Sequence, residues 1–205
     1  MRKLLAVVLL VSAACGVKKG NTNQTEIQKS GEQLLKVLFI IAHTDFRDEE
    51  LTEPRKVFQD AGFRTVVAST DTADAEGMLG IKVKPDILIT EAEADDFAAI
   101  VIAGGSGCKD LWTNTDLIEL VSAFSADDKI TGAICLAPVI LAKAGLLEGK
   151  KATCYHSARD SLIAEGALYE STDVVVAGRI VTASGPSAAR KFGQTLLDLL
   201  TEDTD

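Results

Sequence analysis

Residues 34–201 predict a single open α/β domain, in which a doubly wound, mostly parallel sheet carries helices on both faces. Short, nearly continuous apolar runs alternate along the chain with segments of helical periodicity. This alternation favours parallel strands joined by right-handed helical crossovers. A length of 205 residues with 47% hydrophobic content suits one globular domain with a substantial core.

The first half of the domain shows three strands and one helix in order. The run LKVLFIIA, residues 35–42, predicts the first strand because an apolar run of this length is typical of a strand covered on both faces. Amphipathic residues 47–61 predict the first helix. FRTVVAS at residues 63–69 and FAAIVIAGG at residues 97–105 predict the next two strands.

The second half continues the alternation and ends on a hairpin and a helix. KITGAIC, residues 129–135, predicts the fourth strand. Further helices are predicted at residues 117–124, 138–144 and 158–165. Residues 174–184 predict a hairpin that turns at Ala177 and Gly178. Pro186 favours the first turn of a closing helix over residues 186–200.

The first 15 residues have the layout of a secretory signal. Arg2 and Lys3 precede an apolar run that is too short to span a bilayer comfortably, and small residues lead into Cys15. This junction is similar to a bacterial lipobox, although Ser12 stands where leucine is usual. We expect an exported protein that is anchored through acylated Cys15 to a bacterial membrane, on its periplasmic side or at the cell surface. Ordinary signal cleavage and an uncleaved N-terminus are the alternatives. Polar residues 16–33 predict a flexible tether.

Charge and motif content exclude several classes of function. A formal net charge of −9 and a pI near 4.8 argue against a basic patch for nucleic acid or an anionic membrane surface. The chain has two histidines and no cysteine and histidine cluster with zinc spacing, so we expect no metal. GGSG at residues 104–107 is too short for a dinucleotide fingerprint and is interpreted as a tight turn, so no cofactor is expected.

Unusual residues gather at the predicted carboxyl ends of three strands, where ligands bind in such sheets. His43 follows the first strand, Cys108 lies shortly after the third and Cys135 ends the fourth. We expect His43 at the edge of a pocket. Cys108 and Cys154 can line the same pocket or pack in the core.

Cys135 stands at a strand-to-helix turn, the position of a nucleophile elbow. Free N–H groups of the turn and the following helix favour a thiolate, so we predict a pKa below the usual value of about 8.5. Backbone N–H groups of Leu136, Gly104 and Gly105 could stabilise an oxyanion. A buried cysteine that acts as a small hydrophobic residue explains the same local sequence equally well.

Four segments together resemble the DJ-1/PfpI superfamily, which has the class I glutamine amidotransferase-like, flavodoxin-like fold. They are FRDEELTEP, IVIAGGSG, AICLAP and TASGPSAARKFGQTLLDLL, and the resemblance covers nearly all of residues 35–200. The resemblance implies that Glu50, four residues before Pro54, meets the sulfur of Cys135, stays protonated and assists proton transfer. It also implies a homodimer.

Two departures from the family pattern bear on the reaction. Peptidase-like members usually carry histidine directly after the cysteine, where this chain has Leu136, so peptidase activity is disfavoured. Glyoxalases and deglycases take a histidine from a later strand, and the position that aligns best with it here is Tyr155. His156 comes one residue after that position. In a strand, an offset of one residue would point its side chain to the opposite face of the sheet. If the strand has ended before His156, its side chain can still reach the thiol.

Two functions fit the resemblance. The first is a glyoxalase- or deglycase-like enzyme for small reactive carbonyls such as methylglyoxal, in which Cys135 is the nucleophile, Glu50 moves the proton and His156 or Tyr155 assists. The second is a redox-sensing or chaperone-like stress protein in which Cys135 oxidises with little turnover. Export would place the cysteines in an oxidising compartment, where Cys135 can form a disulfide.

Overall fold

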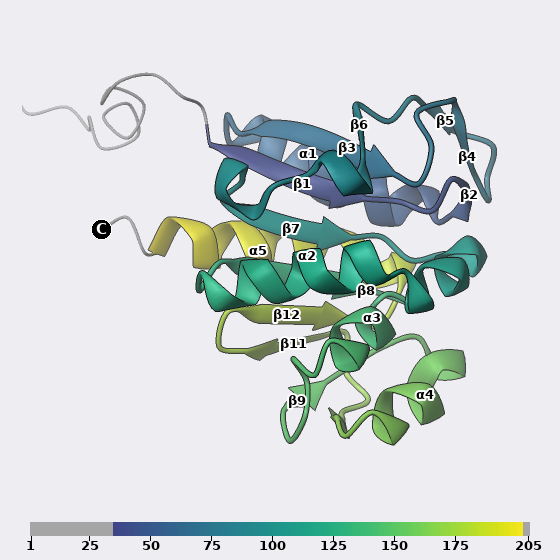
Figure 1. Ribbon diagram of the computed structural model, residues 1–205. Coiled ribbons are helices and arrows are strands. Elements are labelled where there is room, and N and C mark those ends of the chain that lie inside the picture. The colour runs from purple at the N-terminus through teal and green to yellow at the C-terminus, as the bar shows by residue number, and fades with distance from the viewer. Residues whose placement is uncertain (1–34, 203–205) are drawn as a thin grey trace, which may run out of the picture. The chain divides into compact units, whose positions relative to one another are not determined.

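A seven-stranded sheet forms the centre of the domain in the computed structural model, which describes residues 35–202 (Figure 1). The strand order is β11-β12-β8-β7-β1-β3-β6, and every neighbouring pair is parallel except β11 with β12. The strands are β1 (Lys36–Ile40), β3 (Arg64–Ser69), β6 (Ile87–Leu88), β7 (Ala99–Ile102), β8 (Ile130–Ile134), β11 (Val174–Ala177) and β12 (Ile180–Ala183). This topology confirms the predicted fold class. The predicted signal segment, the tether and Cys15 lie outside the described residues.

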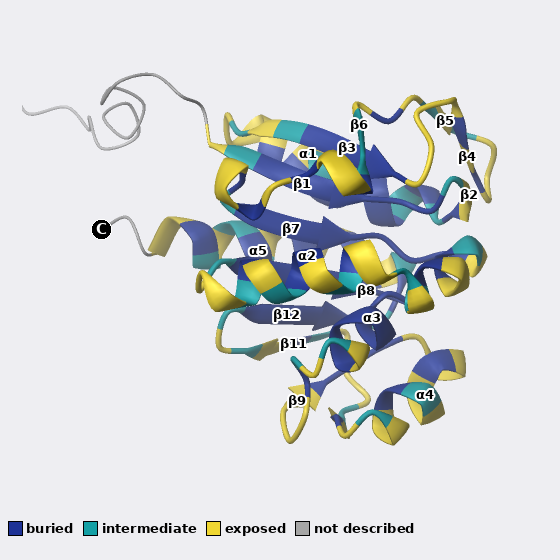
Figure 2. Ribbon diagram, viewed as in Figure 1, coloured by how far each residue is buried: buried dark blue, intermediate teal, exposed yellow. Residues whose placement is uncertain are grey.

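The middle of the sheet is buried on both faces (Figure 2). Every residue of β7 and β8 is buried, which is why both strands stand out in the sequence as apolar runs. Gly132 in β8 leaves room for the closing helix, because a Cβ atom there would lie 2.9 Å from side-chain atoms of Phe192 and Leu196. This tight packing fixes the position of β8 relative to α5, and with it the position of the residue that follows β8.

Helices cover the two faces of the sheet. In Figure 1, α2 (Thr115–Ala126) and α3 (Pro138–Lys143) lie in front of it, and α5 (Ala189–Glu202) lies behind it. The first helix, α1 (Asp48–Asp60), packs against α5. Gly193 permits this close approach, because a Cβ atom there would lie 2.7 Å from Cα of Pro54. The predicted helix at residues 158–165 is α4 (Arg159–Ala164), which packs against α3.

Several short elements were not predicted. A small sheet of β2 (Thr44–Phe46), β4 (Ala75–Gly77) and β5 (Lys82–Val83) adjoins the carboxyl end of β1, and β9 (Lys151–Ala152) pairs with β10 (Leu168–Tyr169). Short 3-10 helices are η1 (Ile89–Glu91), η2 (Ala94–Asp96), η4 (His156–Ala158) and η5 (Pro186–Ala188). Strands of two or three residues are too short to show a periodic pattern.

The turn predicted at GGSG is instead the start of a longer 3-10 helix. Gly105, with φ of 101°, precedes η3 (Ser106–Thr113). The prediction of a tight turn did not include this helix, in which the chain continues to coil. Residues 35–202 contain no helix that is both long and apolar enough to cross a bilayer.

Candidate active site

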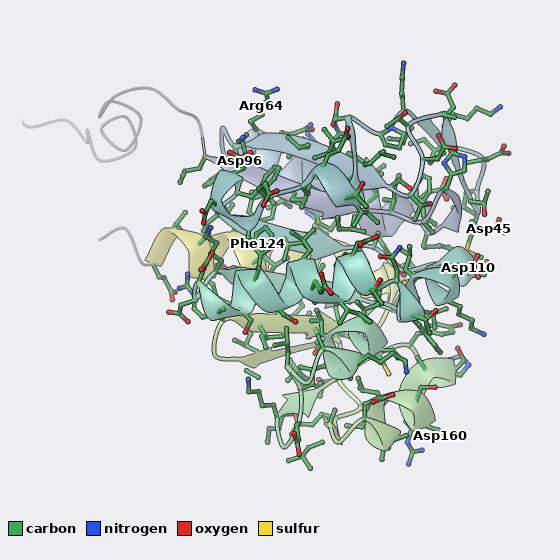
Figure 3. The ribbon with its side chains drawn as sticks, viewed as in Figure 1. Asp45, Arg64, Asp96, Asp110, Phe124 and Asp160 are labelled. Carbon is green, nitrogen blue, oxygen red and sulfur yellow. The ribbon has the colours of Figure 1, made fainter. Side chains whose placement is uncertain are left out.

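The carboxyl ends of β1, β7 and β8, which are neighbours in the sheet, bring three loops together at one end of the domain. The Arg47 N–H donates to the Gly104 carbonyl over 3.0 Å. Gly107 packs directly on the Thr44 carbonyl, since a Cβ atom there would lie 1.9 Å from that oxygen. Figure 3 shows Asp45, which follows β1, and Asp110 of η3 at this same end.

Cys135 forms a strained elbow between β8 and α3. Its φ is 65°, which a residue other than glycine rarely adopts and which costs about 1–3 kcal/mol. Hydrogen bonds hold the elbow from several sides: Cys135 N–H donates to the Ala183 carbonyl over 2.9 Å, and Tyr155 N–H donates to the Cys135 carbonyl over 2.8 Å. The Trp112 indole Nε1 donates to the Leu136 carbonyl over 3.0 Å. The thiol residue is 6% exposed.

Glu50 lies beside this elbow in the first turn of α1 and is fully buried. Its Oε2 accepts a hydrogen bond from the Gly104 N–H over 2.9 Å, and its Oε1 accepts none from the described residues. Gly104 lets the two groups approach, because a Cβ atom there would lie 2.7 Å from Cβ of Cys135 and 2.8 Å from Oε2 of Glu50. Pro54 lacks an N–H, so it cannot donate to the Glu50 carbonyl one turn before it.

Burial raises the pKa of Glu50 from its ordinary 4.5 to about 7. The thiol of Cys135 and the Gly104 N–H act in the opposite direction, because they stabilise the ionised carboxylate. An unpartnered oxygen in a buried carboxyl suits the protonated form, which can donate a hydrogen bond to the sulfur. A large share of Glu50 therefore keeps its proton near neutral pH.

The predicted direction of the Cys135 pKa was wrong. Burial and then the negative charge of Glu50 raise the pKa of Cys135 from 9.0 to about 12, although the N–H groups of Gly105 and Leu136 lower it. The prediction weighed the turn and the helix, but α3 has only 6 residues, and loss of hydration outweighs both. Glu50 therefore loses its proton near pH 7, whereas the Cys135 thiol keeps its proton through the neutral range.

Two backbone donors remain at the sulfur. The N–H groups of Gly105 and Leu136 lie close enough to the sulfur of Cys135 to favour its thiolate. The Gly104 N–H, which we expected to be a third donor, is occupied by Glu50. The site thus has two N–H groups next to the position where a reacting oxygen would lie.

Tyr155 lies in the loop after β9, and His156 is the first residue of η4. The Tyr155 main chain is bonded to the elbow, and its ring packs on Gly185, where a Cβ atom would lie 3.2 Å away. His156 is exposed, and its ring is 4.2 Å from that of Tyr155. Strand alternation does not decide the direction of His156, because β9 ends at Ala152. Within residues 35–202 its imidazole has no hydrogen bond or ion pair to Cys135.

The other candidate residues differ in their relation to the pair. His43 is partly buried, and its Nδ1 has no hydrogen-bond partner among the described residues. Cys108 is fully buried; burial first, and then the negative charges of Cys135 and Glu50, raise its pKa. Burial alone raises the pKa of Cys154 to about 12. All three described cysteines are free thiols, and the described part of the chain holds no cluster of metal-binding side chains.

Two residues that support the site had no role in the sequence prediction. Trp112 fixes the Leu136 carbonyl, and its being the single tryptophan of the chain was a usable signal. Asp48 is buried, and its carboxylate accepts N–H groups of Leu79 over 2.9 Å and Ile81 over 3.0 Å. Asp48 thereby ties the turn between β4 and β5 to the first turn of α1, which also carries Glu50.

Comparison with known proteins shows similarity over the whole domain. Residues 35–199 match the DJ-1/PfpI family. An uncharacterized protein of Methanocaldococcus jannaschii is 45% identical over 210 residues, which cover 99% of this chain and 100% of that protein. Deglycase PfpI of Pyrococcus furiosus is 32% identical over 166 residues, which cover 81% of this chain and 99% of the relative. The crystal structure of a ThiJ/PfpI domain protein from Brachyspira murdochii superposes with a TM-score of 0.81 at 34% identity, covering 83% of this chain and 99% of that one.

Proposed function

Because the chain belongs to the DJ-1/PfpI family, we propose that it is a cysteine-dependent enzyme that acts on small reactive carbonyl compounds. One observation carries the proposal: the thiol of Cys135 stands on a strained elbow next to the fully buried carboxyl of Glu50. The thiol of Cys135 keeps its proton at neutral pH and the Glu50 carboxyl exchanges its own near pH 7, so a sulfur nucleophile and a group that can carry its proton share one site. The name of the Pyrococcus furiosus relative, a deglycase, supports the same substrate class.

Bond formation at sulfur begins the proposed reaction. The sulfur of Cys135 adds to the aldehyde carbon, and the thiol proton passes to the Glu50 carboxylate when the pair starts as thiol and carboxylate. The carbonyl oxygen becomes an oxyanion that the N–H groups of Gly105 and Leu136 stabilise, and Glu50 then returns a proton to it. The product of this step is a hemithioacetal.

Conversion of methylglyoxal to lactate needs no external oxidant, because one carbon is oxidised while its neighbour is reduced and water is added. Protons must move between carbon and oxygen atoms of the bound substrate for this to occur. Glu50 is placed to carry them. Tyr155 lies next to the elbow through its main chain, and we assign the assisting role to Tyr155 or His156. Leu136, in place of a histidine, disfavours peptidase activity.

The alternative function is a redox-responsive stress protein with little turnover. The second buried thiol, Cys108, which is electrostatically coupled to Cys135 and Glu50, favours this alternative. Both functions use Cys135, so chemistry at this residue alone does not separate them.

The deciding experiment is mass spectrometry of lactate formed from methylglyoxal. Purified protein, its Cys135→Ser variant and its Cys154→Ser variant are compared under reducing conditions. Cys154 is the matched control because it is also a buried thiol, without a charge interaction with the pair. We expect lactate from the native protein and from Cys154→Ser, and none from Cys135→Ser. Absence of lactate from the native protein would favour the stress-protein alternative.

A further inference from the structure

A second thiol, Cys108, lies at the active site without a part in the proposed reaction. It belongs to η3, and this helix is attached to the elbow near both of its ends. Just before its start, Gly104 packs against the elbow, because a Cβ atom there would lie 2.7 Å from Cβ of Cys135. In the last turn, the Trp112 indole donates to the Leu136 carbonyl over 3.0 Å. Cys108 lies between these two attachments and is 0% exposed.

Cys154 also lies next to the elbow through the main chain, but its thiol does not interact with Cys135 and Glu50. Cys154 directly precedes Tyr155, whose N–H bonds to the Cys135 carbonyl, and it is 1% exposed. Its thiol is influenced by burial alone, whereas the thiol of Cys108 also feels the charges of Cys135 and Glu50. The thiol of Cys108 therefore lies within electrostatic range of the reactive pair, and that of Cys154 is not coupled to it.

We propose that Cys108 is a resolving thiol for Cys135, which closes an internal disulfide after a hydroperoxide has oxidised the Cys135 sulfur. This inference rests on the reactive Cys135 of the proposed function. The disulfide would hold the sulfur at a reversible stage and prevent its further oxidation to sulfinic acid, which is not readily reversed.

The two chemical steps balance with a hydroperoxide as the oxidant. In the first, the Cys135 sulfur attacks the distal peroxide oxygen, the O–O bond breaks, and an alcohol or water leaves with the proton of the Cys135 thiol, carried by Glu50. Cys135 is then a sulfenic acid. In the second, the Cys108 sulfur attacks the Cys135 sulfur, the S–O bond breaks, and the proton of the Cys108 thiol reaches the leaving oxygen through Glu50. Water leaves, and one disulfide has formed.

Closing the disulfide would require η3 or the elbow to adjust until the two sulfur atoms meet. A disulfide requires Cα atoms about 4.4–6.8 Å apart. η3 is a 3-10 helix, whose hydrogen bonds have poorer geometry than those of an α-helix, so its first turn can adjust at low cost. β8 on the other side is buried and fixed in the sheet. We therefore expect η3, rather than the elbow, to move when the bond forms.

The test treats the reduced, full-length protein with hydrogen peroxide and maps its tryptic peptides by mass spectrometry without reduction. Cleavage at Lys109, Lys129, Lys143 and Lys151 puts each described cysteine on a different peptide. We expect a Cys108–Cys135 linked peptide in the native protein and in Cys154→Ala. We expect its loss in Cys108→Ala, together with a rise in sulfinic acid at Cys135.

Results on the native protein alone decide the inference, so a Cys108→Ala variant that fails to fold does not weaken the test. The inference is overturned if the native protein accumulates sulfinic Cys135 without a link to Cys108, or links Cys135 to Cys154. Lactate formation is measured on the same preparation before peroxide is added. Formation of lactate without the disulfide would support the proposed function and overturn the inference. Formation of the disulfide without lactate would support the inference and contradict the proposed function.

Discussion

Replacing Glu50 by glutamine should remove a pH dependence from the stability of the protein. The folded-state pKa of Glu50, about 7, lies above its ordinary value of 4.5, so the folded protein binds this proton more tightly than the unfolded chain does. Its contribution to stability is fully present below pH 4.5 and is lost as pH rises to about 7. At about 1.4 kcal/mol for each pKa unit, the loss amounts to about 3 kcal/mol.

Glutamine keeps the shape of the side chain and has no proton to lose. Its oxygen can accept the Gly104 N–H as Oε2 does now, and its amide takes the place of the protonated Oε1. The free energy of unfolding is measured by urea denaturation at pH 5 and pH 8 for native protein, Glu50→Gln and Glu53→Gln. Glu53 is the matched control, because it lies on the same helix with its carboxylate 42% exposed and 3.5 Å from Arg190.

Between pH 5 and pH 8, the free energy of unfolding of Glu50→Gln should rise by about 2.5 kcal/mol relative to that of the native protein. The free energy of unfolding of Glu53→Gln should stay close to that of the native protein at both pH values, because an exposed ion pair contributes little to stability. Lactate formation should be lost in Glu50→Gln even where the variant is the more stable form. Parallel curves for Glu50→Gln and native protein would refute the conclusion that burial keeps this carboxyl protonated.

Four further outcomes follow from the same geometry. Glu50→Gln removes a negative charge next to Cys135, so the alkylation rate of Cys135 by iodoacetamide should rise at a lower pH than in native protein; an unchanged profile would mean that the two groups are not coupled. Gly104→Ala should cost about 1–3 kcal/mol of stability and abolish turnover, because its Cβ atom would overlap Glu50 and Cys135, and denaturation at fixed pH checks this. Cys15→Ala should abolish incorporation of a fatty-acid analogue and partition into detergent, and equal labelling of both forms would contradict lipid anchoring. Light scattering of purified protein should give twice the mass of one chain, and the mass of a single chain at all concentrations would exclude the homodimer.

The fold could be predicted largely because its central strands are covered on both faces. β1, β7 and β8 appear as apolar runs, and proline marks the start of α3. The small sheet of β2, β4 and β5 could not be predicted, since its pairing depends on loops that meet only in three dimensions. The same limit applies to Asp48, whose partners Leu79 and Ile81 are remote in the sequence.

The candidate site was predictable in its residues and less so in its electrostatics. Cys135 and Glu50 come together, as the sequence and the family resemblance implied. The direction of the Cys135 pKa depends on how completely the loops exclude water, which no local pattern records. Cys108 and Cys154 likewise look equivalent in the sequence, and only the folded structure brings the first of them within range of the charges of the pair.

The hydrogen bond from the Tyr155 N–H to the Cys135 carbonyl leaves the side chain at position 155 free to change during evolution. Every residue except proline carries a main-chain N–H, so the elbow keeps this support whatever side chain stands at position 155. The segment from β9 to β10 also pairs within its own two-stranded sheet, outside the central one. Substitutions at positions 155 and 156 can therefore exchange one assisting group for another, or delete it, while the strained thiol and its carboxyl partner stay in place.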